Sequence, residues 1–193
     1  VYHLPKYTYD SLFYIAKIES FLETLQQICI FVVRRINNSF TMEKKLEIGY
    51  HKYTIDQLPA DDKLLVIEAQ AALKKAYAKY SGFHVGAAVR LASGKILHGA
   101  NSESEVFPSG ICAERSVLYY AEANHASDPV VALAIASDPS ERECYPCGGC
   151  RQVILDVERR QGRAIRLIMS GNGTASVVES AQALLPLPLL FFA

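Results

Sequence analysis

Three cysteines and one glutamate are the residues of this sequence best suited to carry out chemistry. Cys112 and Glu114 lie two positions apart in the stretch Gly-Ile-Cys-Ala-Glu-Arg, and Cys147 and Cys150 form a Cys-x-x-Cys pair further along the chain. A structural zinc site usually closes with four protein ligands, whereas a catalytic site keeps three and leaves one position for water. We therefore expect Cys112, Cys147 and Cys150 to hold one zinc ion. Glu114 would lie close enough to exchange protons with the water without being a ligand.

The combination of the two motifs is more specific than either motif alone. A lone Cys-x-x-Cys could be a redox pair, a structural zinc site or neither. Cys-Ala-Glu followed by Pro-Cys-x-x-Cys, each at a predicted helix start, is the three-cysteine variant of the zinc nucleobase-deaminase signature. Three thiolates would leave the zinc site with excess negative charge, which Arg115 and Arg151 could offset. Helix N-termini would also help to keep the thiolates ionised.

Cys144 raises an alternative, because it forms a second Cys-x-x-Cys with Cys147. If Cys144 were a fourth ligand, the zinc site would be closed and non-catalytic. We expect it instead to be a free cysteine whose replacement by serine leaves activity and zinc content largely unchanged.

The chain resembles the small, homotetrameric, three-cysteine branch of the cytidine deaminase family over about residues 47–186. The resemblance rests on four stretches of this sequence, namely residues 80–88 (Tyr-Ser-Gly-Phe-His-Val-Gly-Ala-Ala), 101–103 (Asn-Ser-Glu), 108–115 (Pro-Ser-Gly-Ile-Cys-Ala-Glu-Arg) and 146–152 (Pro-Cys-Gly-Gly-Cys-Arg-Gln). It implies that Phe83 contacts the pyrimidine ring and that Asn101 and Glu103 bind the ribose 3′-hydroxyl. Considered without the resemblance, Phe83 would be a core aromatic residue, and Asn101 and Glu103 would belong to a polar loop.

The elements that must position these residues alternate between helices and strands. Their order predicts a three-layer α/β/α sandwich around a mixed sheet of about five strands. Val130–Ser137 is apolar almost without interruption, which is typical of a strand buried on both faces. In the helix that follows residues 56–62, we expect the buried stripe to contain Leu64, Ile67 and Ala71, with Leu65 and Ala72 as further candidates, and we expect Ser81-Gly82 to end that helix. The remaining expected elements are strands at 83–91, 95–100, 165–170 and 174–178, helices at 112–124 and 148–160, and a short terminal helix or turn at 180–185.

Composition sets limits on the class of protein. The 193 residues have a net charge of zero and half of them are apolar, so a large core is possible and no basic surplus favours nucleic acid. The five cysteines are an odd number, and three of them cluster as metal ligands, which is typical of a reducing cytoplasm rather than a disulfide framework. No apolar run reaches the roughly 18–20 residues of a membrane span.

Residues 1–41 lie outside the resemblance, and we treat them as an N-terminal extension to a catalytic domain at 42–193. The segment Tyr9–Arg35 has an apolar, helix-like pattern. Because Met42 directly precedes the recognisable domain, we expect Met42 to be the natural start. The alternative is an amphipathic helix that packs on a partner or a membrane surface. The apolar tail after Pro186 departs from the family pattern, and we assign it no substrate role.

The resemblance and the motifs together predict a cytoplasmic enzyme of pyrimidine salvage. It would convert cytidine and 2′-deoxycytidine to the uridines by hydrolysis, with one zinc ion per subunit and Glu114 as the general acid and base. Its partners would be a small nucleoside and further copies of the same chain, not nucleic acid or a membrane. The alternatives are a deaminase of another cytosine-bearing molecule such as blasticidin S, an editing deaminase, and a non-catalytic structural zinc module.

Overall fold

The computed structural model describes residues 17, 20–29 and 43–190, and the chain divides into two units, Val1–Leu46 and Glu47–Ala193. In the first unit, residues 20–29 are helical, in agreement with the helix-like pattern there, and most of the segment Tyr9–Arg35 lies outside the described residues. Met42, the expected start, is likewise outside them. No helix among the described residues combines the length and apolar character needed to cross a bilayer.

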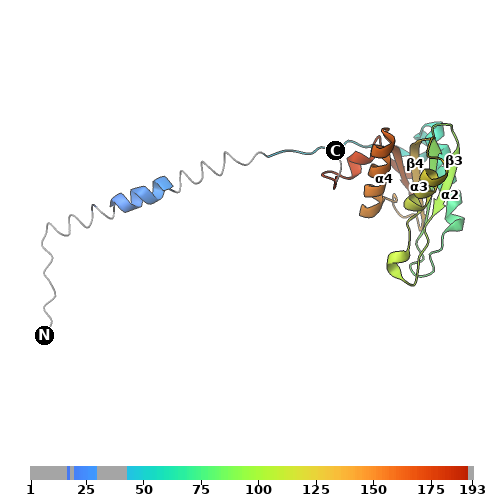
Figure 1. Ribbon diagram of the computed structural model, residues 1–193, viewed down its shortest axis with the longest axis horizontal. Coiled ribbons are helices and arrows are strands. Elements are labelled where there is room, and N and C mark those ends of the chain that lie inside the picture. The colour runs from blue at the N-terminus through green and yellow to red at the C-terminus, as the bar shows by residue number, and fades with distance from the viewer. Residues whose placement is uncertain (1–16, 18–19, 30–42, 191–193) are drawn as a thin grey trace. The chain divides into compact units, whose positions relative to one another are not determined.

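The second unit is built on a mixed six-stranded sheet with the strand order β1-β6-β5-β4-β2-β3 (Figure 1). Only β4 and β5 pair in parallel, and the other neighbours are antiparallel. The sheet has six strands where about five were expected, because His51–Thr54 pairs with β6 and forms one edge of the sheet. The strands are β1 His51–Thr54, β2 His84–Leu91, β3 Ile96–Ala100, β4 Val130–Asp138, β5 Arg166–Gly171 and β6 Thr174–Val178.

Helices lie on both faces of this sheet, which gives the expected α/β/α sandwich. The α-helices are α2 Ala60–Ala72, α3 Ala113–Asn124 and α4 Gly148–Gln161. Four short 3-10 helices join them, η1 Ile55–Gln57, η2 Leu73–Lys75, η3 Phe107–Ser109 and η4 Ala181–Leu184. The helix α2 packs on one face of the sheet, while α3 and α4 pack on the other and touch one another.

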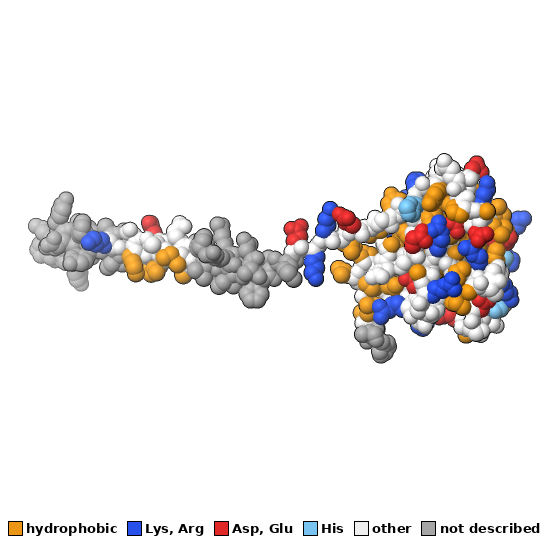
Figure 2. Space-filling model, turned by 90° about the horizontal axis from the view of Figure 1, so that it is seen from above, with side chains coloured by type: hydrophobic (Ala, Val, Ile, Leu, Met, Phe, Trp, Pro, Cys, Tyr) orange, Lys and Arg blue, Asp and Glu red, His pale blue; other side chains and the backbone are white. Residues whose placement is uncertain are grey.

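Charged side chains of both signs are interspersed on the face of the second unit that Figure 2 presents. Lysine and arginine do not gather there into one basic patch. This distribution agrees with the balanced charge of the sequence, which has 20 basic and 20 acidic residues.

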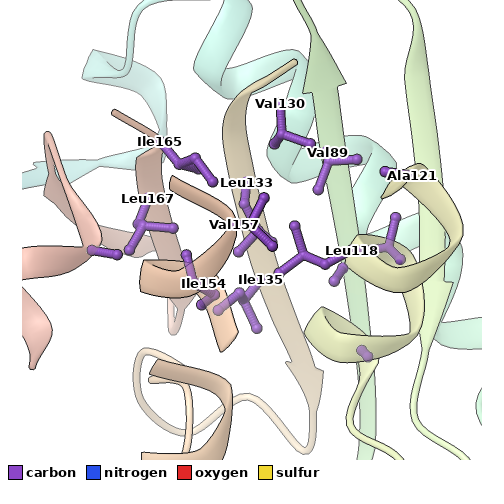
Figure 3. Packing of buried hydrophobic residues seen from close by; sticks show 14 of the residues in the cluster. Val89, Leu118, Ala121, Val130, Leu133, Ile135, Ile154, Val157, Ile165 and Leu167 are labelled. Atoms are coloured by element: carbon purple, nitrogen blue, oxygen red, sulfur yellow. The ribbon is translucent and has the colours of Figure 1, made fainter. Parts of the chain in front are cut away.

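Alternation along β4 divides the core between the two faces. Leu133 and Ile135 point toward α3 and α4, where they pack among Leu118, Ile154 and Val157 (Figure 3). The alternate residues are alanines that face α2, namely Ala132, Ala134 and Ala136. Both sets are fully or almost fully buried, which confirms that this strand is covered on both faces. Because the face toward α2 carries small residues, that helix can approach the sheet closely.

The buried stripe of α2 agrees with the expectation only in part. The further candidates Leu65 and Ala72 are buried, together with Val66 and Ala69, whereas Leu64 and Ile67 are 48% and 50% exposed. The sequence Leu-Leu-Val-Ile is apolar at four consecutive positions, so it offers two candidate faces and does not by itself decide between them.

The end of the first helix also differs from the expectation. The helix stops at Ala72 and continues only as η2, well before Ser81-Gly82. Beyond η2, the backbone N–H of Tyr77 donates to the carbonyl of Asn101 at 2.9 Å, and its carbonyl accepts from the N–H of Glu103 at 2.8 Å. These bonds to residues 101–103 require an extended backbone and therefore compete with continuation of the helix.

Candidate active site

The strand directions explain why the two cysteine motifs meet. Because β3 and β4 are each antiparallel to β2, they run parallel to one another, and β4 runs parallel to β5. The helices α3 and α4, which follow β3 and β4, must therefore both begin at the same end of the strands. The strand β2 starts at that end of the sheet, since it runs in the opposite direction. Residues just before β2, after β3 and after β4 are thus brought together, as is common for sites in open α/β sheets.

Gly99 allows α3 to begin close against β3. A Cβ atom at this position would lie 2.5 Å from the carbonyl oxygen of Ala113 and 2.8 Å from both the Cβ and the backbone nitrogen of Val117. Only glycine leaves room for the first turn of α3 at this distance. The close packing fixes the height of Cys112 and Glu114 relative to the sheet.

The sulfur atoms of Cys112, Cys147 and Cys150 all lie within 4.8 Å of one another, and those of Cys112 and Cys147 are 3.9 Å apart. Two thiolates bound to one tetrahedral zinc ion at about 2.3 Å are separated by about 3.8 Å. The three sulfurs therefore fit a zinc ion that they would share. Cys112 is the N-cap of α3 and Cys147 the N-cap of α4, so both helix N-termini are next to the sulfurs.

The thiol of Cys112 is set up to ionise. A hydrogen bond from the Cys150 thiol and a 3.7 Å contact from Nη2 of Arg115 hold the pKa of Cys112 down at about 5. The same hydrogen bond keeps the proton on Cys150 and raises its pKa. The guanidinium of Arg115 provides positive charge beside the sulfur of Cys112.

The carboxyl of Glu114 lies in the first turn of α3 and is only 4% exposed. Burial raises the pKa of Glu114, and the negative charge of Cys112 acts in the same direction. A carboxyl with a raised pKa beside a metal site can take up and release a proton, as a general acid and base must.

A cavity of about 390 Å³ opens at these residues and is lined by Cys112, Cys147 and Glu114. The expected substrate residues Phe83, Asn101 and Glu103 line the same cavity. Phe83, at 40% exposed, is not a core residue. The structure therefore brings the three groups of expected site residues into one hollow large enough for a nucleoside-sized molecule.

The side chains of Asn101 and Glu103 already have hydrogen-bond partners within the chain. Oδ1 of Asn101 accepts from the backbone N–H of Val85 at 2.8 Å, and its Nδ2 donates to the carbonyl of Phe83 at 2.9 Å. The carboxylate of Glu103 accepts from the backbone N–H groups of Tyr80 at 2.7 Å and of Ser81 at 3.2 Å. An amide carries two donors and two lone pairs, and a carboxylate about four lone pairs. Both side chains therefore keep capacity for a ligand while their orientation is fixed.

Ser102, between those two residues, connects them to the metal cluster. Its backbone N–H and carbonyl form a reciprocal pair with Ile111, with both N···O distances at 2.9 Å, and Ile111 directly precedes Cys112. The segment that carries Asn101 and Glu103 is thus tied by its backbone to the segment that carries the first cysteine.

Arg151, the second residue expected to offset the negative charge, donates hydrogen bonds to two backbone carbonyls. Its Nε donates to the carbonyl of Pro146 at 2.9 Å and its guanidinium also donates to the carbonyl of Leu184 at 3.1 Å. None of its described hydrogen bonds goes to a cysteine. Through these two hydrogen bonds, Arg151 joins the loop before Cys147 to the C-terminal segment.

Cys144 lies outside the group of three cysteines, although it lines the cavity. Burial raises its pKa to about 11, with the charge of Glu114 as a further cause. Its sulfur does not belong to the group whose ligand atoms lie within 4.8 Å of one another, which fits the expected free cysteine and not a fourth ligand.

Two residues at the site were missed by sequence reasoning, Gly99 and Ser81. Ser81 belongs to the stretch 80–88 and to the expected helix stop but was given no role at the site, yet it lines the cavity and its hydroxyl donates to the Glu103 carboxylate. A serine two residues before a proposed substrate residue is the available signal, since serine hydroxyls accept from the N–H two positions on. No comparable signal marks Gly99, because its close contact is with a helix that starts fourteen positions later, at Ala113.

Comparison with known proteins gives one consistent result. Residues 59–162 match the family described as the cytidine and deoxycytidylate deaminase zinc-binding region. A cytidine deaminase of Halalkalibacterium halodurans is 40% identical over 97 residues, which cover 50% of this chain and 72% of that protein. The crystal structure of a cytidine deaminase from Burkholderia pseudomallei superimposes with a TM-score of 0.59 at 35% identity, covering 65% of this chain and 97% of that one. A blasticidin-S deaminase of Bacillus cereus is 33% identical over 79 residues, which cover 38% of this chain and 56% of that protein.

Proposed function

The chain belongs to the family of zinc-binding cytidine and deoxycytidylate deaminases. We therefore propose that it removes the amino group of cytidine and 2′-deoxycytidine by hydrolysis, which gives the uridines and releases ammonia. The observation that carries this proposal is the cavity lined by two of the three clustered cysteines, by the buried Glu114 and by Phe83, Asn101 and Glu103. A pool of free nucleosides in the cytoplasm would be its substrate, and the role that follows is pyrimidine salvage.

Cys112, Cys147 and Cys150 would hold the zinc ion. When bound, zinc supplies a Lewis acid that makes water nucleophilic near neutral pH. The guanidinium of Arg115 offsets part of the negative charge of the three thiolates, since it lies 3.7 Å from the sulfur of Cys112. Arg151 would act on this charge only from a distance, and its hydrogen bonds instead hold the Cys147 loop in place.

Glu114 moves the protons of the reaction. Its carboxylate accepts a proton from the attacking water as the oxygen approaches C4 of the cytosine ring. It delivers that proton to N3. It then transfers the remaining proton of the new C4 hydroxyl to the amino group, so that the C4–N bond breaks, ammonia leaves and the C4 carbonyl of the uridine forms. Its burial keeps bulk water away from this path and favours the protonated form at the intermediate stage.

The remaining side chains orient the nucleoside. The exposed ring of Phe83 would pack against the pyrimidine. The unused hydrogen-bonding capacity of the Asn101 and Glu103 side chains would bind the 3′-hydroxyl of the sugar. A carboxylate at the 3′ position would repel a 3′-phosphodiester, which favours free nucleosides over a strand of DNA or RNA.

An ultraviolet assay tests this proposal with cytidine, 2′-deoxycytidine, cytosine, blasticidin S and a short cytosine-containing oligonucleotide. We expect turnover of the two nucleosides and little of the others. Turnover of blasticidin S or the oligonucleotide in preference to both nucleosides would contradict the proposal.

The variant Glu114→Gln separates the roles of carboxyl and thiols. It should lower kcat by at least about 10²–10⁴-fold and leave one zinc ion per subunit bound. Loss of zinc together with activity would contradict the role of Glu114. X-ray absorption should find three sulfurs and one lighter atom around the zinc, whereas four sulfurs would indicate a closed structural site.

We also propose that the protein is a homotetramer in which residues 42–193 form the catalytic domain and residues 1–41 an extension. Apolar side chains on the surface of the second unit support association, since Leu64, Ile67 and Phe107 are 48%, 50% and 86% exposed. The division of contacts at Leu46 and Glu47 supports the domain boundary. Light scattering during gel filtration would measure the mass of the assembly, and a monomer would contradict this proposal.

A further inference from the structure

The hydroxyl group of Ser81 lies between two residues that we propose for nucleoside binding. Its Oγ donates a hydrogen bond to Oε1 of Glu103, and the backbone N–H of Phe83 donates to the same Oγ at 3.0 Å. A serine hydroxyl has one proton and two lone pairs. Since the proton is directed at Glu103 and a lone pair receives Phe83, the orientation of this hydroxyl is determined from both sides.

The backbone of Phe83 is held from its other side as well. Its carbonyl accepts from Nδ2 of Asn101 at 2.9 Å, and the Oδ1 of that amide accepts from the N–H of Val85 at 2.8 Å. One continuous series of hydrogen bonds therefore runs from Glu103 through Ser81 and Phe83 to Asn101. The series contains all three residues that would contact the base and the sugar.

This series holds the carboxylate of Glu103 in position and favours its ionised form. The Ser81 hydroxyl is the largest cause that lowers the pKa of Glu103, and the N–H groups of Tyr80 and Ser81 act in the same direction. Three donors from residues 80 and 81 leave about one lone pair of the carboxylate free to face the cavity. A sugar hydroxyl that binds there would meet an acceptor whose direction is already set.

We propose that Ser81 is a positioning residue that holds the Glu103 carboxylate and the Phe83 backbone as one unit and thereby determines how tightly the 3′-hydroxyl of the nucleoside is bound. This inference rests on the proposed function, because it assigns Ser81 to the same substrate. Ser81 does not itself touch the reacting atoms. Its effect reaches the substrate through Glu103, and it should therefore depend on whether the substrate carries a 3′-hydroxyl.

A purely local role for Ser81 predicts something different. A serine that only supports its own turn would affect folding, or affect all substrates alike. Ser93 offers a matched comparison, since its hydroxyl likewise accepts the N–H two residues later, from Lys95 at 3.3 Å, in the turn between β2 and β3. That turn is absent from the lining of the cavity.

The test compares the full-length, zinc-loaded wild type with Ser81→Ala, Ser81→Thr and Ser93→Ala, each on cytidine and on 3′-deoxycytidine. Ser81→Ala should raise KM for cytidine about tenfold, the equivalent of one hydrogen bond to a charged group, with a smaller change in kcat. On 3′-deoxycytidine the loss relative to wild type should shrink to about twofold, because the group that Glu103 binds is missing. Ser81→Thr keeps the hydroxyl at an exposed position and should restore most of the affinity.

A direct binding measurement distinguishes the two proposals from one another. Calorimetric titration with uridine, the product, should give a weaker Kd for Ser81→Ala and an unchanged Kd for Ser93→Ala. If wild type turns over cytidine but Ser81→Ala matches it, or loses equally on both substrates, or is not rescued by threonine, Ser81 has no positioning role and the proposed function stands. If wild type neither binds uridine nor turns over cytidine, the proposed function fails and the role of Ser81 fails with it.

Discussion

The close contact at Gly99 predicts that a single methyl group there will move the site residues on α3 away from those on α4. In Gly99→Ala, the new Cβ would lie 2.5 Å from the Ala113 carbonyl oxygen and 2.8 Å from two atoms of Val117. Non-bonded carbon atoms normally sit about 3.5–4.0 Å apart. Backbone atoms of α3 cannot rotate away as a flexible side chain would, so the first turn of α3 must retreat by about 1 Å.

The size of the effect follows from this displacement. Adding one methyl group to a filled core costs about 1–3 kcal/mol, which lowers the melting temperature of a domain of this size by about 3–9 °C. The retreat of α3 carries Cys112 and Glu114 with it, while Cys147 and Cys150 on α4 stay in place. A misplacement of about 1 Å can lower turnover about 100-fold.

Thermal unfolding and the kcat/KM for cytidine measure the two effects in the same sample. Gly49→Ala is the matched control, because no atom lies within 4 Å of a Cβ at that position. It should retain the wild-type melting temperature and kcat/KM. A Gly99→Ala variant with kcat/KM within about threefold of wild type would refute the inference that this glycine sets the position of the catalytic helix.

Three further results are expected. A hydrogen bond from the Thr174 hydroxyl, and as the next largest cause one from Lys52, lowers the pKa of the almost buried Glu143 to about 2. The contribution of Glu143 to the free energy of unfolding should be complete above its unfolded pKa of about 4.5 and should fade as the pH falls toward 2. In urea unfolding experiments, Glu143→Gln should lack this decline in stability. Cys144→Ser should leave kcat and zinc content within about twofold of wild type, and loss of zinc would make Cys144 a ligand. Asp62→Ala breaks a buried ion pair with Arg166 at 2.8 Å. It should lower the free energy of unfolding by about 2–3 kcal/mol, less than for a fully buried pair, because Arg166 keeps a second carboxylate partner. An unchanged stability would contradict this.

The metal cluster is the part of the molecule for which the sequence alone was most informative. Cys112 and Cys147 lie at helix starts, and helix starts can be recognised from local patterns such as a change in hydrophobic period. The chemistry of zinc then limits which residues can share one ion. Both kinds of information are local or chemical, so neither depends on knowing the packing of the sheet.

The face of α2 shows why other features could not be predicted. Leu64 to Ile67 are all apolar, so their pattern permits either of two faces, and the choice is made by the alanines of β4 that lie opposite. The early end of that helix is decided in the same way, by bonds from Tyr77 to residues more than twenty positions away. Such long-range competition leaves no trace in the local sequence.

Details of the substrate side fall between these cases. The motif at 101–103 predicted polar groups in the right place, yet not that Asn101 and Glu103 would be engaged with residues 80–85. That engagement depends on β2 starting at the same edge of the sheet at which β3 ends, a consequence of their antiparallel pairing.

The one-sided placement of the chemistry leaves the opposite end of the sheet open to engineering. The connections at residues 92–95, 125–129 and 162–165 all lie at that far end, since they follow β2, α3 and α4. Of these, residues 92–95 are exposed throughout and form a simple turn. A fluorescent dye or a surface tether attached there would be separated from the cavity by the length of the strands, so the enzyme could be immobilised or tracked while it turns over.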